Sequence, residues 1–211
     1  MGIGGLIIVD KDIVEEENLN RLGYYVSDLG KPKVRVVEER LLALSKVRGI
    51  DFPLNIRAFY ANIFDLPEIE DIIRMSDCVL LALDDLDARL EINELALKHR
   101  KWLIDGGAST NGLRGRVTVV KPYEWPCLGC YFSSDALAVE GDIENITCNV
   151  SLPTTMSIIA AIEADQCLRI LTDRPGVSPL TLISLEEGVE INKINDVYRR
   201  PNCPYCSNRR S

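Results

Sequence analysis

Two Cys-x-x-Cys pairs constrain the fold more than any other feature of this sequence. Cys127 and Cys130 form the first pair, Cys203 and Cys206 form the second, and 72 residues separate the two pairs. Two thiolates at this spacing can bind one zinc ion, and a second pair completes a tetrahedral site. Two disulfides or a redox motif are the alternatives, but reducing compartments rarely retain disulfides and a redox motif normally occurs once. The spacing therefore predicts a structural Zn²⁺ site that ties the end of the chain to an earlier loop.

The composition is that of an ordinary globular protein. The 211 residues are 46% hydrophobic and 27% charged, which suits one domain with a buried core. The net charge of −8 argues against nucleic acid and anionic membranes as partners. No apolar run reaches the roughly 20 residues of a membrane span, and the first residues lack a signal-peptide pattern. We therefore expect a cytoplasmic protein that binds neither nucleic acid nor membrane.

Strand and helix patterns alternate along most of the chain. Short apolar runs are typical of strands buried on both faces, and helical periodicity between them favours a parallel sheet. The expected strands are 5–9, 54–61, 78–83, 102–105, 113–120, 180–185 and 189–194, and the expected helices are 32–46, 66–75, 86–98 and 154–171. The pattern predicts an α/β fold with a Rossmann-like, doubly wound and mostly parallel sheet.

Acidic residues close two of the expected strands. Asp10 follows the run 5–9 and Asp84 follows the run 78–83. In open α/β sheets, ligands bind beyond the carboxyl ends of the strands, where one acid can bind ribose hydroxyls and another can hold Mg²⁺. Solvated loop acids are the alternative in a chain with 32 acidic residues.

Two basic residues and one cysteine are further candidates. Lys33 lies in the first turn of an expected helix, where a cation opposes the helix dipole unless an anion such as phosphate binds there. Arg21 offers a planar guanidinium to the same phosphates, and two solvated surface cations are the alternative. Cys148 precedes another expected helix start, a position that suits either a nucleophilic thiol or an unreactive one.

Taken together, these stretches resemble the ubiquitin-activating-enzyme superfamily, which includes the bacterial sulfur-carrier adenylyltransferases. The segment 9–33 (VDKDIVEEENLNRLGYYVSDLGKPK) is similar to the family signature, and 80–93 (LLALDDLDARLEIN) is similar to the motif with the magnesium aspartate. The stretches IDGGASTNGLRGRVTVVKP and WPCLGC resemble the next strands and the first zinc pair. The resemblance extends from Gly2 to Cys206 and keeps the order of the motifs.

The resemblance implies a role for each matched residue. Asp10 would bind the ribose of ATP, and Asn18, Arg21 and Lys33 would contact its phosphates. Asp84 would coordinate Mg²⁺, so that Arg21, Lys33 and Asp84 also act in catalysis. The paired cysteines would hold zinc.

The segment 147–161 (TCNVSLPTTMSIIAA) is especially similar to the region around the thioester cysteine in the activating enzyme of the ubiquitin-fold modifier. This similarity makes Cys148 the candidate thioester nucleophile. The implied partners are a ubiquitin-like or sulfur-carrier protein, a conjugating enzyme or sulfur donor, and a second subunit in a homodimer or heterodimer.

One departure from the family concerns the first strand and its GxGxxG turn, which family members carry upstream of the Asp-x-Asp. Here nine residues precede Asp10. In the strand order 3-2-1-4-5-6 the first strand lies between the second and the fourth, so we expect a gap between the strands 5–9 and 78–83. A late start, a fragment and a split protein are the three explanations. The expected organisation is an N-terminally truncated adenylation domain over 1–211, with a crossover segment 133–153 and a zinc-anchored tail 195–211.

The resemblance implies ATP-dependent activation of a ubiquitin-like or sulfur-carrier protein by adenylation of its C-terminus, followed by thioester formation. Adenylation without a thioester is one alternative. A non-catalytic scaffold half of a heteromeric activating enzyme is another. A nicotinamide dehydrogenase would explain neither the paired cysteines nor the sequence Asn-Leu-Asn-Arg.

Overall fold

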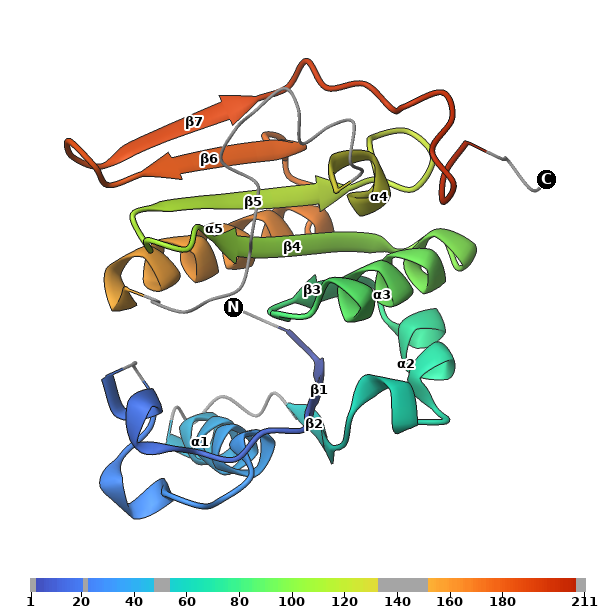
Figure 1. Ribbon diagram of the computed structural model, residues 1–211. Coiled ribbons are helices and arrows are strands. Elements are labelled where there is room, and N and C mark those ends of the chain that lie inside the picture. The colour runs from blue at the N-terminus through green and yellow to red at the C-terminus, as the bar shows by residue number, and fades with distance from the viewer. Residues whose placement is uncertain (1–2, 21–22, 48–53, 133–151, 208–211) are drawn as a thin grey trace. The chain divides into compact units, whose positions relative to one another are not determined.

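The computed structural model describes residues 3–20, 23–47, 54–132 and 152–207 (Figure 1). The chain forms two compact units, Met1–Ile72 and Ile73–Ser211, and each contains a sheet of its own. Both units combine helices with a parallel strand pair, which confirms the predicted α/β class. Among the residues described, no helix has both the length and the apolar composition that crossing a membrane requires.

The first unit is a parallel strand pair packed against a helix. β1 (Gly5–Asp10) pairs with β2 (Asn55–Tyr60). α1 (Lys33–Val47) packs on both strands and buries Val34 and Val36. The described residues of this unit also form three short 3-10 helices, namely η1 (Glu16–Asn20), η2 (Val26–Asp28) and η3 (Ile63–Asp65). The helix α2 (Ile69–Met75) leads into the second unit.

The second unit contains a five-stranded sheet in the order β3-β4-β5-β6-β7. Its strands are β3 (Cys78–Leu81), β4 (Trp102–Ala108), β5 (Arg114–Val120), β6 (Leu180–Ser184) and β7 (Glu190–Ile194). β3 and β4 are parallel, whereas the other three pairings are antiparallel. The sequence pattern predicted mostly parallel pairing, but among the described residues of this unit only the β3–β4 pair is parallel. The connections 109–113 and 185–189 are too short for the crossover that parallel neighbours need, so the strands that they join pair antiparallel.

Three helices accompany this sheet (Figure 1). They are α3 (Leu86–Lys98), α4 (Leu128–Tyr131) and α5 (Pro153–Leu171). α5 packs on β3, β4 and β5, and Ile159 joins a buried core with strand residues such as Ile104 and Val117. β4 and β5 approach α5 closely at two glycines, since a Cβ on Gly106 or Gly115 would lie within 2.7 Å of an Ile159 side-chain atom. β4 continues through Gly106 to Ala108 by pairing with β5, beyond the expected end of this strand at residue 105.

The strands on either side of the expected gap do not pair with each other. Within the described part of the chain, β1 pairs with β2 alone and β3 pairs with β4 alone. Each is therefore an edge strand of its own sheet, as expected for the residue ranges 5–9 and 78–83. Most of the expected crossover segment, residues 133–151, lies outside the described residues.

Candidate functional site

The four paired cysteines form one buried cluster. The sulfur atoms of Cys127, Cys130, Cys203 and Cys206 lie within 4.8 Å of one another. Neighbouring sulfurs are 3.4 Å apart between Cys130 and Cys206 and 3.6 Å apart between Cys127 and Cys203. Four thiolates bound tetrahedrally to zinc at about 2.3 Å lie about 3.8 Å from one another, so the donor set fits Zn²⁺. The predicted convergence of the two pairs is confirmed.

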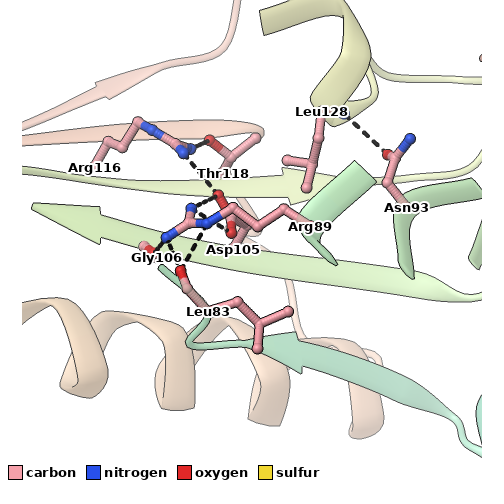
Figure 2. A network of polar contacts seen from close by, with 8 residues as sticks. All are labelled: Leu83, Arg89, Asn93, Asp105, Gly106, Arg116, Thr118 and Leu128. Carbon is pink, nitrogen blue, oxygen red and sulfur yellow. Dashed lines mark hydrogen bonds and ion pairs between the residues drawn. The ribbon is translucent and has the colours of Figure 1, made fainter. Parts of the chain in front are cut away.

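Side chains from outside the cluster fix both halves of it. Asn93 of α3 is fully buried, and its Oδ1 accepts the backbone N–H of Leu128 at 3.0 Å, directly after the first cysteine (Figure 2). Arg199 donates hydrogen bonds to the carbonyl oxygen of Tyr123, at 2.7 Å, and to that of Cys206. The loop with the first cysteine pair is therefore held by α3, and the C-terminal segment with the second pair is held against the residues before that loop.

In the first unit, the predicted nucleotide ligands Asp10 and Lys33 meet through a third residue, Asp12. The Nζ of Lys33 lies 2.9 Å from Oδ2 of Asp12, and the Lys33 N–H donates to the Asp12 carbonyl. The Asp12 N–H in turn donates to Oδ1 of Asp10 at 2.8 Å. Asp12 offsets the unfavourable position of Lys33 at the start of α1. Sequence analysis gave Asp12 no role, although its Asp-x-Asp spacing with Asp10 was a usable signal.

The other two phosphate-binding candidates of this unit have different outcomes. Asn18 is buried, and its Oδ1 accepts the N–H of Glu15 at 3.0 Å, so the oxygen of its side chain stabilises the turn that contains η1. Arg21 lies outside the described residues. Its predicted contact with phosphate stays a prediction.

Asp28 is a residue of this region that sequence analysis did not single out. Its buried carboxylate accepts the Tyr25 N–H at 2.8 Å and pairs with Arg40 of α1. These interactions lower the pKa of Asp28, and the hydrogen bond from the Tyr25 backbone has the largest effect. Asp28 therefore ties the segment before Lys33 to the helix that Lys33 begins.

In the second unit, Asp84 lies exposed in the short turn between β3 and α3. Asp85 caps α3, with its Oδ1 accepting the Ala88 N–H at 2.7 Å. The carbonyl oxygen of Leu83 accepts a hydrogen bond from Nε of Arg89 at 2.7 Å. Asp84, the predicted magnesium ligand, thus lies between two residues that hydrogen bonds hold in place. Cys148, the predicted nucleophile, lies outside the described residues.

A buried ion network lies beside this turn (Figure 2). Nη1 of Arg89 contacts both oxygens of the fully buried Asp105, at 2.7 and 2.9 Å. Arg116 contacts the same carboxylate at 2.8 Å and donates to Thr118 Oγ1 at 2.7 Å. Sequence analysis missed this network, although Asp105 stands out as an acid within an apolar strand.

The second unit also contains a cavity of about 480 Å³ on the sheet face opposite α5. Because Gly115 faces α5, its neighbours Arg114 and Arg116 point to the opposite face. Both arginines line the cavity, together with Phe132, Leu182 and Asn192. A volume of this size is typical of a binding site for a small ligand or a short peptide segment.

Comparison with known proteins now identifies the family. The chain belongs to the ThiF family, whose model matches residues 1–205. It is 30% identical to ubiquitin-like modifier-activating enzyme 5 of Xenopus laevis, in a match that covers 84% of this chain and 47% of the relative. The enzyme of the same name from Dictyostelium discoideum is also 30% identical, with 98% of this chain and 55% of the relative covered. The chain therefore spans about half the length of these relatives.

Solved structures show the same fold. The crystal structure of E. coli MccB with ATP has a TM-score of 0.72 at 19% identity and covers 97% of this chain and 60% of that one. PaaA has a TM-score of 0.67 at 22% identity, covering 92% of this chain and 65% of that one. These similarities confirm a Rossmann-like fold of the ThiF type.

Proposed function

We propose that this protein activates a ubiquitin-like or sulfur-carrier protein by ATP-dependent adenylation of its C-terminus and then forms a thioester through Cys148. The observation that carries the proposal is the relationship to enzymes named ubiquitin-like modifier-activating enzyme 5 over 84% to 98% of the chain. The linked residues Asp10, Asp12 and Lys33 support it, because they lie at the carboxyl end of a parallel strand and the start of a helix.

In the proposed reaction, an oxygen of the partner's C-terminal carboxylate attacks the α-phosphorus of ATP. The bond between the α- and β-phosphates breaks, and the products are an acyl adenylate and pyrophosphate. No general base is required, because the carboxylate is already ionised at pH 7. The Cys148 thiolate then attacks the acyl carbon, AMP leaves, and the thiol proton passes to solvent.

The residues have distinct proposed tasks in this reaction. Asp10 binds the ribose, while Lys33, with Asn18 and Arg21, binds phosphate oxygens and offsets the charge that moves onto pyrophosphate. Asp84 would hold Mg²⁺, which supplies further positive charge to the phosphates when bound. The cysteine cluster would hold Zn²⁺ as a structural ion, consistent with its burial.

The partners follow from the same proposal. We place the extended C-terminal tail of the modifier in this cavity, whose lining combines apolar side chains such as Phe132 and Leu182 with the polar Asn192. A conjugating enzyme or a sulfur donor would accept the activated product, and a second subunit in a homodimer or heterodimer would complete the assembly. We place the protein in the cytoplasm, which agrees with six free cysteines among the residues described.

The first test is binding of Mg-ATP to this chain by calorimetry, with zinc content and mass measured on the same sample. Micromolar binding is expected. Pyrophosphate exchange with ubiquitin-fold modifier or a sulfur-carrier protein should then survive in Cys148→Ala, while the reducible modifier adduct should disappear. Cys78→Ala is the matched control, since this thiol has no part in the proposal, and it should keep both activities.

Each alternative predicts a different result. A wild-type chain that exchanges pyrophosphate but never forms a reducible adduct performs adenylation alone. A folded, zinc-loaded chain that does not bind Mg-ATP would contradict the enzymatic proposal and favour a scaffold subunit.

A further inference from the structure

The side chain of Arg89 makes an unusual set of contacts at the end of β3. Arg89 is 4% exposed, and its guanidinium donates to the Leu83 carbonyl oxygen through both Nε, at 2.7 Å, and Nη2. Nη2 also donates to the Gly106 carbonyl at 3.2 Å, while Nη1 binds both oxygens of Asp105 (Figure 2). One planar group therefore joins the end of β3 to two consecutive residues of β4.

The Leu83 carbonyl belongs to the peptide bond that contains the nitrogen of Asp84. Because a peptide unit is planar, two hydrogen bonds to this oxygen fix the orientation of the whole Leu83–Asp84 unit. On the other side, Asp85 caps α3 and its carbonyl accepts the Arg89 N–H at 3.1 Å. Asp84 is thus exposed on a backbone that is held at both ends.

We propose that Arg89 is a positioning residue that holds the Leu83–Asp84 peptide and so presents the Asp84 carboxylate in place for a divalent cation. The inference rests on the proposed function, which assigns Mg²⁺ to Asp84. An exposed carboxylate fits this ion, since Mg²⁺ is usually bound through one or two carboxylates, several waters and substrate phosphates. A preformed carboxylate binds more tightly because less backbone freedom is lost when the ion arrives.

The network offers a matched control. Arg116 pairs with the same carboxylate of Asp105, at 2.8 Å, but its Nη1 donates to Thr118 rather than to the turn. Removal of either arginine leaves Asp105 with one cationic partner, so both variants lose a comparable buried ion pair. Of these two arginines, Arg89 is the one that contacts Leu83.

The experiment compares Arg89→Met with Arg116→Met in the full chain. The first readout is hydrogen exchange of the Asp84, Asp85 and Leu86 amides without nucleotide or metal, at equal temperature below each variant's Tm. We expect faster exchange in Arg89→Met than in Arg116→Met. The second readout is calorimetric binding of ATP with and without Mg²⁺. We expect the increase in ATP affinity that Mg²⁺ produces to fall roughly 10- to 100-fold in Arg89→Met, while the affinity for metal-free ATP stays unchanged.

Equal exchange rates and equal Mg²⁺ gains in the two variants would overturn the inference. If Arg89→Met does not fold, Arg89→Lys is compared with Arg116→Lys instead. Lysine keeps the charge beside Asp105, but its single ammonium cannot also donate to the Leu83 carbonyl oxygen as the guanidinium does. A wild-type chain that binds no Mg-ATP would contradict the proposed function instead. The exchange comparison would still decide whether Arg89 holds the turn.

Discussion

Glu163 of α5 is a buried acid without an ion-pair partner among the residues described. Its side chain lies under Gly106, where a Cβ would come within 2.7 Å of the Glu163 Cδ, and its Oε1 is buried with no hydrogen-bond partner. Burial, and next the negative charge of Asp105, raise the pKa of Glu163 to about 8, although Arg89 and Arg116 oppose this rise. Glu163 is therefore protonated in the folded protein at neutral pH.

This raised pKa predicts a loss of stability with rising pH. The folded state holds the Glu163 proton more tightly than the unfolded state, in which the pKa of this group is near 4.5. Stability is therefore intact below pH 4.5 and falls as pH rises to about 8, by at most about 1.4 kcal/mol per pH unit from this group. Glu163→Gln removes the titration, so its free energy of unfolding should increasingly exceed that of the wild type between pH 5 and about 8.5.

Urea unfolding at a series of pH values measures this difference. Glu91→Gln on the exposed face of α3 is the control, because it makes the same chemical change away from the buried cluster. A constant difference between Glu163→Gln and wild type over the whole pH range would show that Glu163 is already ionised in the fold.

At the scale of elements, α3 connects the Asp84 turn with the cysteine cluster. Arg89 near its start contacts the Asp84 turn, and Asn93, one turn later, contacts Leu128 beside the cysteine cluster (Figure 2). The sequence predicted α3 with its observed bounds from its helical pattern, and the structure adds Asp85 as the cap. It could not show these contacts, because they join residues distant along the chain.

The hydrogen bond that the Leu128 N–H donates to Asn93 predicts an effect on metal retention. Asn93→Ala leaves the buried Leu128 N–H without an acceptor, a loss that costs about 1–3 kcal/mol. Zinc bound to the cysteine cluster should therefore transfer to a chromogenic chelator faster from Asn93→Ala than from the wild type. Glu91→Ala, an exposed change on the same helix, should not alter the rate. Unchanged transfer from Asn93→Ala would show that the cysteines alone set zinc retention.

Other elements show why prediction from sequence is incomplete. The range 102–105 was expected as a strand, but β4 extends to Ala108, because residues 106–108 continue the pairing with β5, and Gly106 leaves room for Ile159 of α5. The glycines gave no strand signal, since their benefit depends on a helix about fifty residues later. The position of Asp10 at a strand end and the convergence of the four cysteines could be predicted, because strand ends and Cys-x-x-Cys spacing are local patterns. The Asp12–Lys33 pair spans a whole connection and could not.

At the scale of the whole molecule, the notable property is a pair of sheets that each end in an apolar edge strand. Within the described residues, β1 and β3 each pair on one side, and their side chains Leu6 and Leu80 are 37% and 47% exposed. An edge strand of this kind can pair with another chain, and proteins commonly protect such edges with charged residues such as lysine. Neither β1 nor β3 contains a lysine.

We therefore expect Leu80→Lys to slow self-association of this chain. Light scattering during warming should rise later or more slowly than in the wild type, while Tm changes little, because Leu80 is half-exposed and contributes modestly to the core. Leu86→Lys is the matched control, since Leu86 is 45% exposed but lies on α3, where no strand edge is available. If both lysines suppress scattering equally, net charge rather than the β3 edge governs association. If only Leu80→Lys does so, the edge of β3 is the surface through which copies of the chain pair.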